Sequence, residues 1–199
     1  MMPRHSALIH APVWDLTTRV WHWALAISVT VGWCLGEFRS FSTVEWHFYF
    51  GYATGSLLAF RYAWGFVGPA PIRHSTLLMS IFDVFHYLRC LKEPEPSGIP
   101  GHNPLGALSV FAILFALTIQ VISGLFSEDD GLFSAGPFAT EVGDEVVRKM
   151  TLVHNFGARV VLGLLGLHVV AIIFYAFYKR ENLTLAMITG RKLVRREKN

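Results

Sequence analysis

Two histidines, His154 and His168, lie in one apolar stretch of the chain, residues 151–178. Fourteen residues separate them, which on an α-helix is about 21 Å along the axis and within about 40° of the same face. An imidazole inside an apolar membrane segment is costly without a partner, so two on one stripe need partners at two depths. Haem iron fits this need best, since histidine is its usual protein ligand. The alternative is a histidine that only hydrogen-bonds a neighbouring helix, which a second such residue disfavours.

The composition predicts an integral membrane protein. Of 199 residues, 53% are hydrophobic and 16% charged, which is too apolar for an ordinary soluble domain, and the chain is too short for a large transporter. The apolar stretches long enough to cross a bilayer as helices are residues 17–36, 46–67, 105–126 and 151–178. We expect one domain, residues 1–199, with outer loops at 37–45 and 127–150, a cytoplasmic loop at 68–104 and a tail at 179–199. The first stretch lacks the cleavage pattern of a signal peptide and is expected to be retained.

Lysine and arginine are unevenly distributed over these loops. Twelve lie on the side that holds both ends of the chain, three lie on the other side, and two lie inside spans. This bias predicts a multi-pass membrane protein with both termini in the cytoplasm. The second outer loop is instead rich in acidic residues. Because the basic tail adjoins a membrane span, it predicts contact with anionic lipid and not with nucleic acid.

The histidines inside the spans match in depth as two pairs. His22 lies about one turn from the cytoplasmic end of the first span, whereas His47 lies at the outer end of the second. In the last span, which runs inward, His154 is near the outer surface and His168 is deeper. Depth therefore pairs His47 with His154 as ligands of an outer haem iron. It pairs His22 with His168 as ligands of an inner one.

Five further histidines lie outside the spans. His5, His10, His74 and His86 are expected to be solvated or interfacial, and His86 belongs to a segment that reads as an amphipathic helix on the membrane surface. His102 directly precedes the third span and is the reserve ligand if His22 fails.

The two cysteines favour b-type haem. Cys34 and Cys90 are predicted on opposite sides of the bilayer, so they cannot form a disulfide within the chain. Neither belongs to a Cys-x-x-Cys-His pattern. Any haem is therefore expected to be held by coordination and packing, without thioether bonds.

An arginine is predicted beside the inner haem. Arg61 follows His47 by fourteen residues on the same helix face, at the depth of His168. Because a buried guanidinium needs an anionic partner, we expect Arg61 to neutralise a haem propionate. Arg159 is a weaker candidate at the outer haem, and snorkelling to the surface is the alternative for both.

Glycines on or near the histidine stripes could leave room for a flat macrocycle. An equally good interpretation is close packing of helices through small residues. The residues concerned are Gly51, Gly55, Gly157, Gly163 and Gly166.

Several motifs occur along the chain in a characteristic order: VWDLTTRVWHW near the start, RYAWGFVGP at the end of the second span, GHNPLGA before the third, the pair His154 and His168, and ENLTLAMITGRK near the end. Together they resemble the prokaryotic cytochrome b561 family, which includes the b-type cytochrome subunits of nickel-iron hydrogenases. The resemblance covers residues 12–192. It implies an all-α transmembrane four-helix bundle in the bacterial inner membrane, with two b-type haems stacked across that membrane. By resemblance, the ligands fall on His22, His47, His154 and His168.

Two redox centres across a membrane predict electron transport, with no catalytic residue in the chain itself. We expect the protein to exchange electrons between membrane quinone and a periplasmic c-type cytochrome or oxidoreductase subunit, attracted by the acidic outer loop. One alternative is a superoxide:quinone oxidoreductase, in which Arg148, Lys149 or Arg159 attracts the anion to the outer haem. The other is a structural membrane anchor for a periplasmic oxidoreductase.

Overall fold

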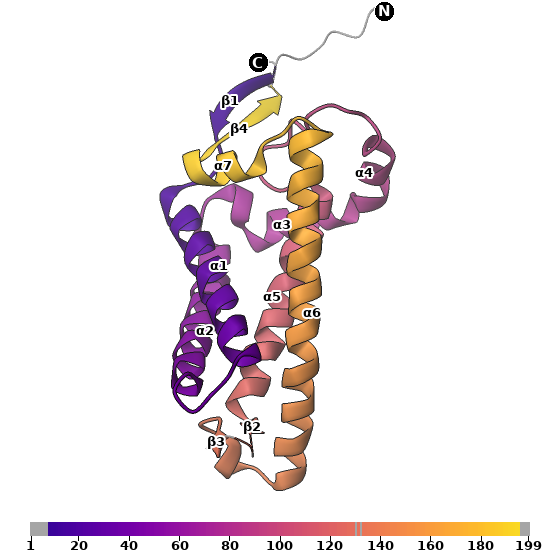
Figure 1. The fold of residues 1–199 in the computed structure, drawn as a ribbon. Coiled ribbons are helices and arrows are strands. Elements are labelled where there is room, and N and C mark those ends of the chain that lie inside the picture. The colour runs from indigo at the N-terminus through magenta and orange to yellow at the C-terminus, as the bar shows by residue number, and fades with distance from the viewer. Residues whose placement is uncertain (1–7, 130, 132, 196–199) are drawn as a thin grey trace, which may run out of the picture. The chain divides into compact units, whose positions relative to one another are not determined.

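The computed structural model describes residues 8–129, 131 and 133–195, and this part of the chain is mostly helical (Figure 1). Its long helices are α1 (Leu16–Glu37), α2 (Val44–Val67), α5 (Pro104–Leu125) and α6 (Asp144–Phe177). The shorter elements are α3 (His74–Phe82), α4 (Val84–Cys90), α7 (Leu183–Thr189) and the 3-10 turns η1 (Ala70–Ile72) and η2 (Ala139–Glu141). Each predicted apolar stretch coincides, to within two residues at most ends, with one long helix.

Helix α6 begins well before the apolar stretch that predicted it. The carbonyl of Gly143 accepts hydrogen bonds from the backbone N–H groups of Val146 and Val147 at 2.8 and 3.2 Å. Asp144 and Glu145 occupy the first turn, where negative charge is favourable near the positive end of the helix dipole. The helix therefore starts in a polar segment, and the connection after α5 is shorter than the predicted loop 127–150.

Two small antiparallel ribbons correct the expectation of an all-helical chain. Strand β1 (Leu8–Pro12) pairs with β4 (Arg191–Arg195), and β2 (Glu128–Asp129) pairs with β3 (Ser134–Ala135). Gly190, with φ of 78°, ends α7 in the left-handed conformation that glycine adopts readily and leads the chain into β4. The predicted tail is thus ordered as a helix and a strand through Arg195.

The predicted amphipathic helix in the 68–104 loop is broken in two. Asp83, with φ of −89° and ψ of 2°, lies outside the helical region of backbone angles and separates α3 from α4. His86 is exposed on α4, as expected for a solvated or interfacial histidine.

The chain forms two compact units. Unit 1 comprises the residues up to Val20, Trp64–Val110 and the residues from Gly166 onward, and unit 2 comprises Trp21–Ala63 and Phe111–Leu165. The helices α1, α2, α5 and α6 each contribute residues to both units. His22, His47 and His154 belong to unit 2, whereas His168 belongs to unit 1.

Unit 1 is built around the ribbon of β1 and β4, which lie side by side in Figure 1. Trp14, Ile72 and Ala186 form its buried apolar cluster. Lys192 of β4 and Glu181 form an ion pair of 3.0 Å in which each side chain is 3% exposed. The described ends of the chain are therefore held together.

Unit 2 joins its helices through polar contacts as well as apolar packing. Ser28 of α1 and the hydroxyl of Thr54 in α2 lie 2.9 Å apart, and both face the carbonyl of Phe50. The hydroxyls of Tyr62 in α2 and Thr118 in α5 lie 2.7 Å apart. Such hydrogen bonds hold helices together where water is excluded.

Two of the described helices, α5 and α6, are long and apolar enough to cross a membrane by length and composition. In their most apolar windows only 17% and 11% of the residues are buried. A helix in the core of a soluble domain is mostly buried, so the low values favour contact with lipid. Helices α1 and α2 do not meet the same criterion, and four membrane crossings therefore stay a prediction.

Candidate functional site

His47 of α2 and His154 of α6 lie together in unit 2. Their ring centroids are 6.0 Å apart and their ring planes are inclined by 87°. Two imidazoles that bind one ion from opposite sides, through bonds of about 2 Å, have centroids about 6 Å apart. The observed separation therefore fits a pair of axial ligands on one haem iron.

The His47 imidazole is held by two residues of α1. Its Nδ1 lies 2.9 Å from the backbone oxygen of Gly32. Because a carbonyl oxygen can only accept, Nδ1 carries the proton and Nε2 keeps the lone pair that can bind a metal. Gly36 lies against the ring, and a Cβ added there would be 2.9 Å from Cε1 and 3.1 Å from Nδ1.

The His154 imidazole is held in the same way by α5. Its Nδ1 lies 3.0 Å from the backbone oxygen of Gln120, so the lone pair is on Nε2, which lies 3.4 Å from the side-chain amide nitrogen of Gln120. A Cβ added at Gly124 would be 2.9 Å from Cε1 and 3.1 Å from Nδ1 of this ring. Hydrogen bonding of the second nitrogen to a backbone carbonyl is the usual support for a ligating histidine.

We call these two arrangements the imidazole clamps: the Gly32 carbonyl with Gly36 for His47, and the Gln120 carbonyl with Gly124 for His154. In each clamp the carbonyl and the glycine are four residues apart on the helix that precedes the histidine's own helix in sequence. Sequence reasoning missed all four clamp residues. The signal in the sequence that could have found the two glycines near the rings is a small residue on the preceding span, at the same depth in the membrane as the histidine.

The predicted glycines divide into two groups. No described protein atom lies within 4 Å of a Cβ added at Gly51, Gly163 or Gly166. Gly51 lies one turn after His47, so there is open space on α2 beside this histidine, as a flat macrocycle would require. A Cβ at Gly55 would instead lie 3.2 Å from Val121, and one at Gly157 would lie 2.4 Å from Oε1 of Gln120. For these two glycines, contact with protein is the better interpretation.

His22 and His168 are both half-buried. His22 contacts Trp23 edge-on, with ring centroids 5.3 Å apart. The two histidines belong to different units, so their pairing as ligands of the inner haem stays a prediction.

Arg61 lies next to the turn of α1 that carries His22. Its guanidinium carbon is 5.7 Å from the ring centroid of Trp21, and the indole N–H of Trp21 donates to the carbonyl of Leu57 at 2.8 Å. Arg61 is 3% exposed, which disfavours snorkelling to the surface. Its predicted role toward a haem propionate is compatible with this buried position and stays a prediction.

The segment between α5 and α6, together with the first turn of α6, carries exposed acidic residues. Arg39 forms an ion pair with Asp129 and donates from Nη1 to the carbonyl of Gly36 at 3.2 Å. Among the basic residues considered for anion attraction, Lys149 pairs with Glu145 at 2.6 Å. The other two, Arg148 and Arg159, are exposed. The exposed carboxylates include Glu128, Glu141, Asp144 and Glu145, while Asp130 lies outside the described residues.

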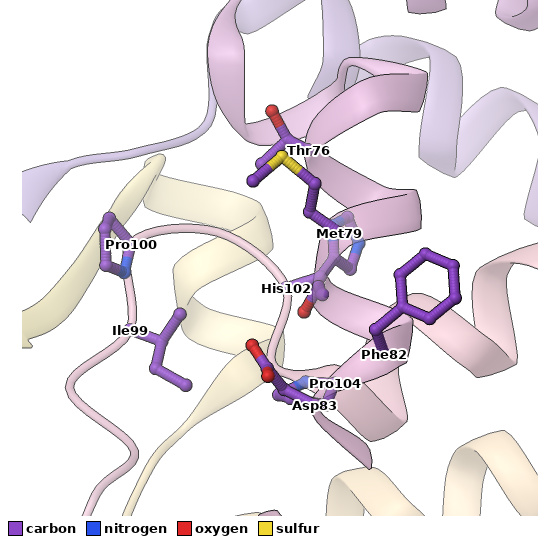
Figure 2. A pocket seen from close by; sticks show the side chains of 9 residues that line it. Thr76, Met79, Phe82, Asp83, Ile99, Pro100, His102 and Pro104 are labelled. Carbon is purple, nitrogen blue, oxygen red and sulfur yellow. The ribbon is translucent and has the colours of Figure 1, made fainter.

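A pocket of about 530 Å³ opens in unit 1 between α3 and the segment that leads into α5 (Figure 2). His102 lines it and also contacts Trp14, with ring centroids 4.8 Å apart. The walls combine apolar and polar side chains, namely Thr76, Met79, Ser80, Phe82, Asp83, Ile99, Pro100, His102 and Pro104.

Comparison with known proteins gives one result. A family model described as prokaryotic cytochrome b561 matches residues 13–190. No curated protein matches the chain. The matched range contains all four long helices, both imidazole clamps and every residue of the predicted haem sites, and it confirms the resemblance inferred from the sequence motifs.

Proposed function

Because the chain belongs to the prokaryotic cytochrome b561 family, we propose that it carries electrons between membrane quinone and a periplasmic redox partner. As a member, it is a membrane-bound b-type cytochrome of helical architecture that functions in electron transfer. Beyond what family membership gives, we propose two haems, four histidine ligands, quinone as the substrate and a partner that binds on the periplasmic side.

The outer haem site is formed by His47 and His154. The observation that carries this assignment is the 6.0 Å separation of two rings whose Nδ1 atoms both face backbone carbonyls. Both imidazoles therefore have Nε2 available for iron, and the clamps restrict their rotation. Bound haem supplies the reversible one-electron chemistry, while these residues hold and orient it.

The sequence assigns the inner haem to His22 and His168, and Arg61, beside the turn of α1 that carries His22, would be the cation for a propionate. The burial of Arg61 against Trp21 supports this assignment, because a buried guanidinium is stabilised by an anionic group. The pairing of β1 with β4 supports a chain whose two ends lie on the same side of the membrane. The positive-inside bias of the sequence makes that side cytoplasmic.

The exposed carboxylates of unit 2 support a partner with a basic docking surface. A periplasmic c-type cytochrome or an oxidoreductase subunit would be steered toward these residues by charge. Quinone is the membrane-soluble substrate, and the pocket lined by His102 offers the mixture of apolar walls and hydrogen-bonding groups that its ring requires.

The proposal predicts the effect of one substitution in this pocket. His102→Ala should retain both haems but slow their reduction by a quinol analogue several-fold, because a polar contact to the quinone ring is lost. His86→Ala, which changes an exposed residue outside the pocket, is the matched control. The measurement is stopped-flow absorbance of the haems in purified, fully haem-loaded protein.

Failure of the unmodified protein to show any haem reduction by quinols would contradict the proposed substrate. Loss of a haem from His102→Ala would instead identify His102 as an iron ligand in place of His22.

A further inference from the structure

One side of the pocket in unit 1 is formed by residues 98–101, which we call the pocket wall. Ile99 and Pro100 of this wall line the pocket across from α3 (Figure 2). They lie between two buried glycines, Gly98 and Gly101, whose φ angles are 65° and 99°. Residues with a side chain rarely adopt such angles. The backbone of the pocket wall therefore follows a path that depends on glycine at both of its ends.

Strand β4 holds the carbonyl groups of both glycines. The backbone N–H of Arg195 donates to the carbonyl of Gly98 at 2.9 Å, and Nζ of Lys192 donates to the carbonyl of Gly101 at 2.8 Å. A Cβ added at Gly98 would lie 2.5 Å from Cγ of Arg195, so the two segments are in close contact at this point. The pocket wall is therefore attached to β4 at each of its ends.

Glu181 holds the ammonium group of Lys192 in place. Its carboxylate lies 3.0 Å from Nζ, and it also accepts from the backbone N–H and the hydroxyl of Ser97 at 2.8 and 3.1 Å. Because an ammonium group has three N–H donors, Lys192 can bond to Glu181 and to the Gly101 carbonyl at the same time. This buried ion pair therefore bonds to the chain directly before the pocket wall, at Ser97, and at its last residue, Gly101.

We propose that Lys192 is a positioning residue for the quinone pocket, and that its bond to the Gly101 carbonyl holds the pocket wall in the arrangement that binds quinone. The inference rests on the proposed function, which places quinone in this pocket. Residues 91–103 contain no helix or strand, so the wall has few hydrogen bonds of its own to order it. Where only a fraction of the molecules has the binding arrangement, the apparent affinity falls by that fraction.

The test is the rate of haem reduction at increasing concentrations of a short-chain ubiquinol, followed by stopped-flow absorbance in purified, fully haem-loaded protein. Lys192→Met keeps a long side chain but removes the donor to Gly101. We expect the half-saturating quinol concentration to rise about tenfold, as it does when about a tenth of the molecules has the binding arrangement. The limiting rate at saturating quinol should not change, because Lys192 acts on the wall and not on the bound quinol.

Tyr178→Phe is the matched control. The hydroxyl of Tyr178 donates to the carbonyl of Lys92 at 2.6 Å, so this bond joins the same two parts of the chain outside the pocket wall. Its removal should leave both the half-saturating concentration and the limiting rate unchanged. An effect in Lys192→Met alone would therefore be specific to the bond at the wall.

The double variant Glu181→Gln with Lys192→Met separates positioning from stability. It leaves no uncompensated buried charge, so the hydrogen-exchange protection of β1 and β4 should largely return. The Gly101 carbonyl still lacks its donor, so the half-saturating concentration should stay raised and the amides of residues 98–102 should still exchange faster than in the unmodified protein. A normal half-saturating concentration in the double variant would overturn the inference, because the effect of Lys192→Met would then come from the unpaired charge of Glu181.

An unchanged half-saturating concentration in Lys192→Met would also overturn the inference. His102→Ala distinguishes this outcome from a failure of the proposed function. If His102→Ala slows haem reduction while Lys192→Met behaves like the unmodified protein, the quinone pocket stands and the role of Lys192 is wrong. If quinols do not reduce the haems of the unmodified protein, the proposed substrate and this inference are both wrong.

Discussion

The rings of His47 and His154, the proposed ligands of the outer haem, are held by the residues around them. In each ring Nδ1 faces a backbone carbonyl, at 2.9 and 3.0 Å respectively, and a glycine lies close to Cε1 and Nδ1. The hydrogen bond selects the tautomer, and the glycine limits how far the ring can rotate. Both effects restrict the two side chains before haem binds, so less conformational entropy is lost on binding.

The glycines of the clamps give a prediction at this scale. In Gly36→Ala the new methyl group would lie 2.9 Å from Cε1 of His47, so the ring has to move. We expect occupancy of the outer haem to fall several-fold, because a close-packed site does not absorb such a contact without displacement. Reduced-minus-oxidised absorbance spectra, scaled to protein concentration, measure the haem that remains.

Gly143→Ala is the control for that substitution, since no described protein atom lies within 4 Å of a Cβ at this position. Full haem occupancy in Gly36→Ala would show that the clamp does not restrict rotation of the His47 ring. Gly51→Ala tests where the haem lies. The added Cβ would contact no described protein atom, so a loss of haem from this variant would place the macrocycle beside α2.

The site was predictable from the sequence only in part. Depth in the spans was enough to predict that His47 and His154 lie together, and their ring centroids are 6.0 Å apart. Their role as iron ligands stays a prediction. The roles of Gly36 and Gln120 depend on contacts between different helices, which no spacing within one span reveals. The pairing of His22 with His168 rests on the sequence and is tested by substitution below, and the role of Arg61 stays a prediction.

Among the elements, the long helices follow from continuous apolar runs, whereas the short ones do not. Helix α6 was predicted from residue 151 but starts at Asp144, because its first turn is stabilised by charge and hydrogen bonding and not by burial. Strands β1 and β4 lie at opposite ends of the sequence, and their pairing depends on tertiary contacts. The break at Asp83 likewise has no strong local signal.

The ion pair between Lys192 and Glu181 gives a prediction at the scale of elements. Lys192 also donates to the carbonyl of Gly101 at 2.8 Å, and Glu181 accepts from the backbone N–H and the hydroxyl of Ser97 at 2.8 and 3.1 Å. Removing one partner of such a buried pair leaves the other charge uncompensated, which costs about 3–5 kcal/mol. Lys192→Met should therefore reduce the hydrogen-exchange protection of amides in β1 and β4 by a similar free energy.

Two further variants make that measurement specific. Lys149→Met breaks an exposed pair whose side chains are 64% and 69% exposed, and it should cost less than about 1 kcal/mol. The double variant Glu181→Gln with Lys192→Met removes both charges and should recover much of the protection. Equal protection in Lys192→Met and the unmodified protein would mean that the ribbon does not depend on this pair.

At the scale of the whole molecule, the two predicted sides of the membrane differ in charge. Neutralising Glu128 and Asp144, as Glu128→Gln with Asp144→Asn, should slow electron transfer to a basic c-type cytochrome several-fold at low ionic strength. The difference should shrink as salt is added, since exposed charges are screened within about 10 Å at 0.1 M. Glu95→Gln, an exposed carboxylate in unit 1, is the matched control. Rates that do not depend on salt would mean that the acidic residues do not steer the partner.

The most direct test of the proposed function is the number and type of haems per chain, measured by the pyridine haemochrome assay on protein purified in detergent. We predict two protohaems in the unmodified chain. We predict one in His47→Ala or His154→Ala, and one in His22→Ala or His168→Ala. His74→Ala, which alters a histidine of α3, should keep two. A single haem in the unmodified chain, or two haems in any of the four ligand variants, would contradict the paired-histidine arrangement.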